Sequence, residues 1–111
     1  MLYVTIALFA FAAIIGLLIL KNWLTSANTS RTVVYAHGIF AAVALVLLFI
    51  QNIQNPGGHL RTSLILFIVA AMGGFYMFFR DLKGKFSPTW LAVTHALLAV
   101  SGFVFLLLLV L

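Results

Sequence analysis

The sequence TWLAVTHALLAVSGFVFLLLLVL occupies residues 89–111 and contains no acidic residue, lysine or arginine. An apolar run of this length is typical of a helix that crosses a lipid bilayer, which takes about 20 residues. The chain contains four such runs, at approximately 2–20, 32–50, 60–79 and 90–111. Because the connections between them are short, we predict an all-α, integral membrane, up-down-up-down four-helix bundle that forms a single transmembrane domain over residues 1–111.

The composition also indicates a membrane protein. Apolar residues make up 66% of the 111 residues and charged residues only 6%, which is too little polar material to cover a soluble domain. The net charge of +5 would suggest nucleic-acid binding in a soluble protein, but the basic residues here lie only at the ends of the runs. We therefore expect a lipid partner and no nucleic acid. The absence of cysteine excludes disulfides and thiolate-bound metal centres.

The distribution of charge predicts an orientation. One side of the bundle carries most of the charged residues, namely Lys21, Arg31, Arg80, Asp81, Lys83 and Lys85. The other side has only His59 and Arg61. Basic loops are usually cytoplasmic, so both termini should face outward, and we expect a bacterial inner membrane.

The two halves of the sequence resemble each other when the chain is shifted by 58 residues. Leu8-Phe9 then falls on Leu66-Phe67, and Ala12-Ala13 on Ala70-Ala71. The less common residues that coincide are Gly16 with Gly74 and His37 with His95. We interpret the halves, about 1–53 and 59–111, as two parallel two-helix repeats, although chance matches in so apolar a chain are the alternative.

His37 and His95 are the candidate functional residues. An ionisable side chain inside a membrane span is costly and suggests a functional site. Both histidines lie roughly 8–10 Å along their helices from the basic loops, at similar depth. Their helices are diagonal in the predicted bundle, with axes about 12–14 Å apart, so the imidazoles should be able to hold a metal centre between them.

Haem suits this pair of ligands better than a bare ion. Zinc prefers four ligands, and the spans offer no Cys, Asp or Glu. Copper can use methionine, but Met72 and Met77 lie on one helix without evident clustering. In haem the porphyrin supplies four nitrogens, and the protein needs to supply only one or two axial ligands. We therefore predict one haem b per chain, with His37 and His95 as metal ligands.

Other residues at this depth are candidate cofactor contacts. Small residues should leave room for the macrocycle, and basic or hydroxyl side chains should meet the propionates. The candidates are Gly16, Gly38, Ala41, Gly74, Ala99, Arg31, Arg80, Tyr35 and Thr94. Close packing of helices and binding of lipid headgroups are the alternative roles of these residues.

With these features the chain resembles the membrane-embedded b-type cytochromes, in which small helical bundles hold haem between histidines on different spans. The resemblance rests on His37, His95, the small residues around them and the segment 89–99, TWLAVTHALLA. It implies electron transfer to or from a quinone or a redox partner protein. The di-haem cytochrome b561-like bundles carry a second histidine pair near the other face, and this chain has none.

Several alternatives stay open from sequence. The histidines could form interhelical hydrogen bonds only, in a cofactor-free subunit or assembly helper. A small four-span multidrug transporter fits the size, but its proton relay needs an intramembrane carboxylate, and Asp81 lies in a loop. Whether the protein is an enzyme linked to quinones or superoxide, and whether it forms a homodimer, is likewise left open.

Overall fold

Each of the four apolar runs forms an α-helix in the computed structural model, which describes residues 1–85 and 87–111. The helices are α1 (Leu2–Leu24), α2 (Arg31–Gln54), α3 (Gly58–Leu82) and α4 (Thr89–Leu107). All four are long and apolar enough to cross a membrane. The predicted all-α architecture with four candidate spans is therefore confirmed.

The helix ends differ from the predicted spans by a few residues. The first three helices extend past their apolar runs, because polar residues at a membrane surface can still bond within a helix. The last helix is shorter than predicted and ends at Leu107. After it, the Leu109 N–H donates to the Leu106 carbonyl at 3.2 Å and the Val110 N–H to the Leu107 carbonyl at 3.0 Å. These bonds span three residues, so the chain ends in a tight turn.

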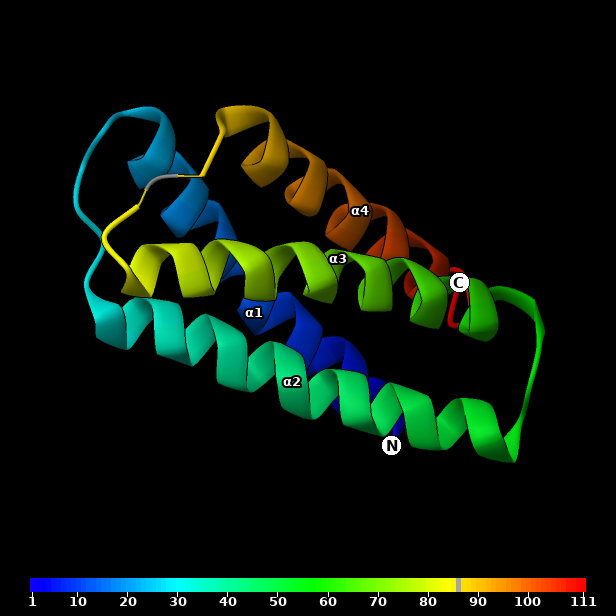
Figure 1. The fold of residues 1–111 in the computed structure, drawn as a ribbon. Helices are drawn as coiled ribbons and strands as arrows, with labels where there is room; N and C mark the ends of the chain where they lie inside the picture. Colours follow the sequence, from blue (N-terminus) through cyan, green and yellow to red (C-terminus); the bar gives the residue numbers. More distant parts are fainter. Residues whose placement is uncertain (86) are drawn as a thin grey trace.

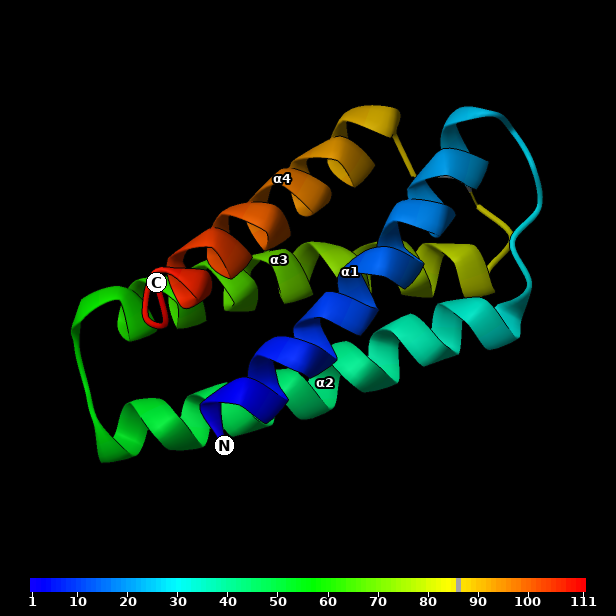
Figure 2. The ribbon, with the colours of Figure 1, turned by 180° about the vertical axis from the view of Figure 1, so that it is seen from behind.

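The helices form a closed ring in the order α1, α2, α3, α4, and every neighbour in the ring is antiparallel (Figures 1 and 2). The α1–α2 and α3–α4 hairpins are the most extensive packings, and α1–α4 and α2–α3 contacts join them. The bundle measures 41 × 23 × 21 Å, which matches the ~40–45 Å thickness of a bilayer with its headgroups. In this ring α2 lies diagonally opposite α4.

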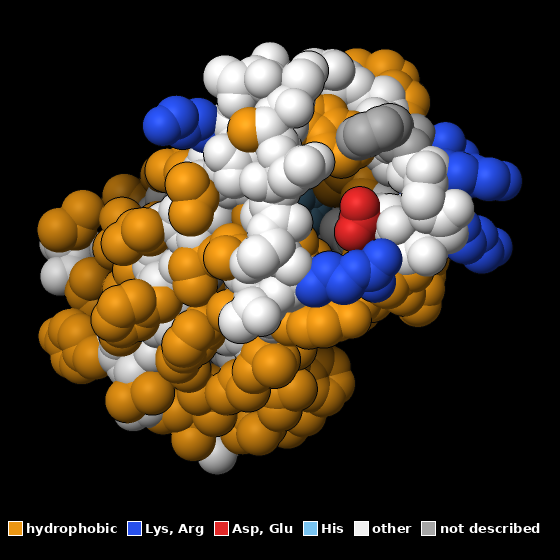
Figure 3. All heavy atoms as spheres, turned by 90° about the vertical axis from the view of Figure 1, so that its left-hand side faces the viewer, with side chains coloured by type: hydrophobic (Ala, Val, Ile, Leu, Met, Phe, Trp, Pro, Cys, Tyr) orange, Lys and Arg blue, Asp and Glu red, His pale blue; other side chains and the backbone are white. Residues whose placement is uncertain are grey.

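The two ends of the bundle have different chemistry. The basic end carries the α1–α2 and α3–α4 connections, and the termini end carries both chain termini and the α2–α3 connection (Figure 1). Lys and Arg side chains spread around the basic end, with the acidic side chain among them (Figure 3). At the termini end the chain reverses at Gly57 and Gly58, whose φ angles of 103° and 62° are unfavourable for residues with a side chain.

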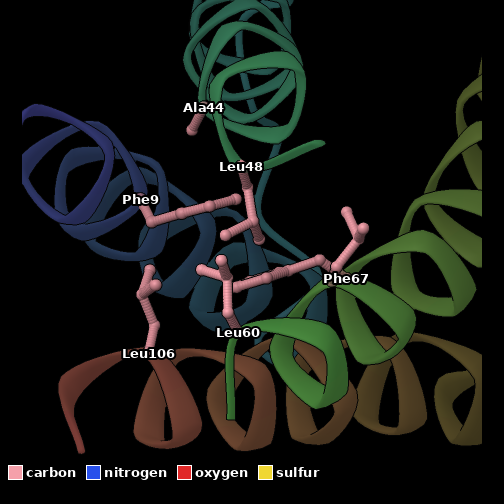
Figure 4. Packing of buried hydrophobic residues seen from close by; sticks show 7 residues of the cluster. Phe9, Ala44, Leu48, Leu60, Phe67 and Leu106 are labelled. Carbon is pink, nitrogen blue, oxygen red and sulfur yellow. The ribbon is translucent and has the colours of Figure 1, made fainter. Parts of the chain in front are cut away.

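The packed core lies in the half of the bundle toward the termini end. Side chains from all four helices converge there (Figure 4). At its centre the rings of Phe9 and Phe67 stack with centroids 3.9 Å apart and planes 3° apart. Across the described residues, the buried hydrophobic ones are Phe9, Ala12, Ala44, Leu48, Leu60, Leu64, Phe67, Ala70 and Leu106. Between the level of His37 and His95 and the basic end, none of the described hydrophobic side chains is buried.

Candidate functional site

The structure brings His37 of α2 and His95 of α4 together across the diagonal of the bundle. Each histidine lies six residues after the first residue of its helix, so the two are at the same depth from the basic end. Their ring centres are 6.3 Å apart, and the ring planes are inclined by 77°. Helices α2 and α4 do not pack against each other, so only long side chains can meet across this gap.

Each imidazole is held by one hydrogen bond to the backbone of the neighbouring helix in its hairpin. His37 Nδ1–H donates to the Ala12 carbonyl at 2.8 Å. His95 Nδ1–H donates to the Ala70 carbonyl at 2.6 Å. A carbonyl oxygen can only accept, so a neutral imidazole carries its proton on Nδ1 and keeps a lone pair on Nε2. Metal-binding histidines commonly have this second bond from the other ring nitrogen.

Two glycines make these bonds sterically feasible. In an α-helix the carbonyl oxygen of each residue points toward the residue four positions later. The Ala12 carbonyl therefore lies next to Gly16, and the Ala70 carbonyl lies next to Gly74. A Cβ atom on Gly16 would lie 2.9 Å from His37 Cε1, and one on Gly74 would lie 2.9 Å from His95 Cε1. Gly16 and Gly74 therefore lie against the imidazoles. The missing side chains leave room for each ring to reach a backbone carbonyl.

The other predicted contacts are more scattered. A Cβ on Gly38 would have no neighbour within 4 Å, whereas Ala99 packs against the core. Ala41, one turn beyond His37 on α2, is half-buried. Thr94 is exposed, and its hydroxyl donates to the Trp90 carbonyl of its own helix at 2.7 Å.

The remaining three candidates lie toward the basic end. Arg31 begins α2 and is exposed. Arg80 is half-buried, with its guanidinium carbon 5.7 Å from the centre of the Tyr76 ring. Tyr35 is exposed, and its ring meets Phe78 edge-on at 5.8 Å.

Sequence reasoning missed the two carbonyl acceptors, Ala12 and Ala70. A backbone carbonyl leaves no signature in residue type, although the shift of 58 residues did align these two alanines. The same shift relates Phe9 to its stacking partner Phe67, and Leu48 to Leu106, both of which are fully buried. The Phe9–Phe67 stack and the His37–His95 pair thus each join residues at corresponding positions of the two hairpins.

The donor atoms near the pair are few. In the described part of the chain, no group of three or more His, Cys, Asp or Glu side chains could hold a metal ion. Two imidazoles can bind a metal only if another molecule completes its coordination, or if the metal accepts two ligands.

The fold and the site thus define a four-helix bundle with membrane-spanning dimensions and a paired-imidazole centre. Comparison with known proteins adds no family to this description, since no protein-family model, curated protein or solved structure matches the chain.

Proposed function

We propose that this protein binds one b-type haem per chain between His37 and His95 and transfers electrons. The observation that carries the proposal is the pair of inward imidazoles, each with Nδ1 engaged by a backbone carbonyl. This arrangement leaves both Nε2 lone pairs for a metal. Porphyrin iron takes one or two further ligands from the protein, and the site offers two.

The separation of the rings agrees with this use. A metal–imidazole bond is about 2.0–2.1 Å long and a ring nitrogen lies roughly 1.1 Å from its ring centre, so imidazoles on opposite sides of one metal have centres roughly 6 Å apart. The observed ring centres are 6.3 Å apart. The separation of the two ring centres is therefore close to that of two imidazoles bound to one metal.

The distribution of packing also supports a cofactor. The Phe9–Phe67 stack closes the bundle on the termini side of the histidines, while the basic half has no buried hydrophobic side chain among its described residues. A macrocycle would complete the core of that half. Its acidic propionates would then point to the basic end, where Arg31 and Arg80 can neutralise them.

The ligand set favours electron transfer over catalysis at the iron. Two strong axial ligands leave no open position for oxygen or a substrate. When bound, haem would supply a one-electron couple, and the protein would hold it in a low-dielectric layer reached from the basic end. A quinone or a redox protein on that side is the expected partner.

The positions shared by the two hairpins suggest how the site arose. We infer two parallel repeats, so that each supplies one histidine, one glycine and one carbonyl acceptor in the same geometry. The basic end should face the cytoplasm of a bacterial inner membrane, with both termini outside. Under this symmetry each hairpin would contribute an equivalent ligand to the bound haem.

The test is haem content of the purified protein, measured by pyridine haemochrome assay and by reduced-minus-oxidised spectra. We expect the wild type, expressed with haem supplied, to carry close to one haem per chain. His37→Ala and His95→Ala should each lose most of it, because one axial ligand is removed. His59→Ala is the matched control, since His59 is exposed at the other end.

A colourless wild-type protein would refute haem binding and favour a cofactor-free membrane subunit. Full haem content in both single variants would place the haem elsewhere. Loss of haem in His59→Ala alone would have the same meaning.

A further inference from the structure

A polar pocket lies at the basic end, between the segment that follows α1 and the start of α4 (Figure 2). Its volume is about 300 Å³. Residues from both segments line it, including Asn22, Trp23, Ser26, Asn28, Ser87 and Thr89. Pockets of ~300–1,000 Å³ are typical of small-ligand sites, and the end of a membrane-spanning bundle is at the depth of lipid headgroups.

Ser87 is the unusual residue in this pocket, because it is polar and yet only 5% of its surface is exposed. Its Oγ is one of the buried side-chain atoms that have no hydrogen-bond partner among the described residues. A serine side chain turns about a single bond, so the hydroxyl can reach a molecule in the pocket that Ser87 lines. A buried hydroxyl without a protein partner is costly, and it points to a partner supplied by a ligand.

The start of α4 is a second source of hydrogen-bond donors beside the pocket. Pro88 precedes the helix, and no side chain caps it. The first N–H groups that bond back into the helix are those of Leu91 and Ala92, to the Pro88 carbonyl at 3.1 and 3.4 Å. Within the described chain, the N–H groups of Thr89 and Trp90 donate to no residue. They lie at the positive end of the helix dipole, where anions bind.

The charge of the basic end also favours an anion. Five of the six Lys and Arg residues are at this end, where they surround the bundle (Figure 3). Two of them are close to the pocket in sequence, since Lys21 precedes Asn22 and Lys85 lies two residues before Ser87. Asp81, the only acidic residue of the chain, does not line the pocket. Hydrogen-bond donors in positive surroundings are what a phosphate group requires.

From the unpaired Ser87 hydroxyl and the uncapped start of α4, we propose that this pocket binds a phosphate group. The Ser87 hydroxyl and the N–H groups of Thr89 and Trp90 would donate to its oxygens. A phospholipid headgroup and soluble phosphate share this chemistry. The headgroup is the expected source, because the pocket lies at headgroup depth and has room for the glycerol beside the phosphate.

The proposed phosphate site is separate from the histidine pair and does not depend on haem binding. His95 lies six residues after Thr89, which is about 9 Å along α4. Ser87 and Thr89 are not among the predicted haem contacts. The titrations described next should therefore give the same result with wild type and with His37→Ala, whether or not haem binds.

The test is a set of three titrations of the full protein in maltoside micelles, which contain no phosphate. The backbone amide signals of Thr89 and Trp90 are followed by NMR. Short-chain phosphatidylglycerol should shift them saturably, and a diacylglycerol with the same acyl chains, which lacks the phosphate, should not. Inorganic phosphate is the third titrant and identifies the source. Half-saturation at a higher concentration than with the lipid assigns the site to the headgroup, and at the same or a lower concentration to soluble phosphate.

Two outcomes of the wild-type titrations would overturn the proposal. The first is the absence of a saturable shift with both phosphatidylglycerol and inorganic phosphate. The second is an equal shift with diacylglycerol, which would show that the pocket binds the apolar part of the lipid and does not recognise phosphate.

Ser87→Ala tests the role of the hydroxyl. It should raise the half-saturation concentration by about tenfold, which corresponds to the loss of one hydrogen bond to a charged group. The Tm of the ligand-free variant should be unchanged or higher, because the hydroxyl has no described partner in the free protein. Ser101→Ala is the control and should bind like the wild type, since the Ser101 hydroxyl is exposed and donates to Leu97 of its own helix.

Unchanged affinity of Ser87→Ala would overturn the proposed contact. A lower Tm of the ligand-free variant would overturn it too, because the hydroxyl would then have a partner within the protein.

Discussion

The positions of the two imidazoles depend on the absence of a side chain at one position of the neighbouring helix. A histidine can reach a helix carbonyl from the side only if the residue four positions later has no side chain in the way. Gly16 and Gly74 satisfy this condition for Ala12 and Ala70. Glycine inside a helix is unfavourable by roughly 0.5–1 kcal/mol relative to alanine. Gly16 and Gly74 therefore lower the stability of their helices, but they allow the histidines to reach the two carbonyls.

Gly16→Ala should therefore displace the His37 ring and weaken its bond to Ala12. The added Cβ would lie 2.9 Å from Cε1, closer than atoms in contact can approach. We expect a loss of about 1–3 kcal/mol in the free energy of unfolding, the range for overpacking. Thermal unfolding in mild detergent, followed by tryptophan fluorescence, measures it.

The matched control is Gly38→Ala on α2, where an added Cβ meets no atom within 4 Å. It should leave stability unchanged or raise it by up to about 1 kcal/mol, because alanine is the better helix former. Equal effects of the two substitutions would show that the contact with His37 does not determine the cost.

At the scale of elements, the hairpins are held by a few polar contacts as well as by packing. The Ser63 hydroxyl of α3 donates to the Gly102 carbonyl of α4 at 2.8 Å, and both residues are buried. At the corresponding place in the other hairpin, Thr5 accepts from Gln51 of α2. In lipid such bonds join helices that have little hydrophobic reason to associate.

Ser63→Ala removes the α3–α4 bond and should lower stability by about 0.6 kcal/mol, and by no more than ~1.7 kcal/mol. Ser101→Ala is its control, because the Ser101 hydroxyl is exposed and donates within α4 to the Leu97 carbonyl. That change should stay within about 0.5 kcal/mol. Unfolding of both variants in the same detergent makes the comparison, and a larger loss for Ser101→Ala would contradict this role of Ser63.

On the scale of the whole molecule, the bundle is asymmetric along its long axis. The packed core fills the half toward the termini end, and the histidines mark where that packing stops. We expect hydrogen exchange in the cofactor-free protein to be faster in the basic-end segments of the helices than in the termini-end segments. Added haem should slow exchange mainly in the basic half, as measured by mass spectrometry. Uniform protection along the helices, with no response to haem, would contradict this.

The orientation can be tested separately, because the natural sequence has no cysteine. Asn55→Cys places a single exposed thiol at the termini end, and Ser26→Cys places one at the basic end. With both termini outside, a membrane-impermeant maleimide should label residue 55 in intact cells. It should label residue 26 only after permeabilisation. The reverse pattern would invert the proposed topology.

The sequence alone was sufficient to predict the helices and the depth of the histidines. In lipid every backbone N–H and C=O must be satisfied within its own segment, so an apolar run of sufficient length forms a helix whatever surrounds it. The rise per residue then places His37 and His95 at the same level, and the short connections make neighbours antiparallel. These are local properties, and they were predicted correctly within a few residues at each end.

Only the tertiary structure decided which way each helix faces. The helices are apolar almost all round, so the pattern of residue types says little about their rotation. Rotation is determined by contacts between residues far apart in the chain, such as the Phe9–Phe67 stack and the bonds of the imidazoles to Ala12 and Ala70. Those contacts turn two histidines of matching depth into a facing pair.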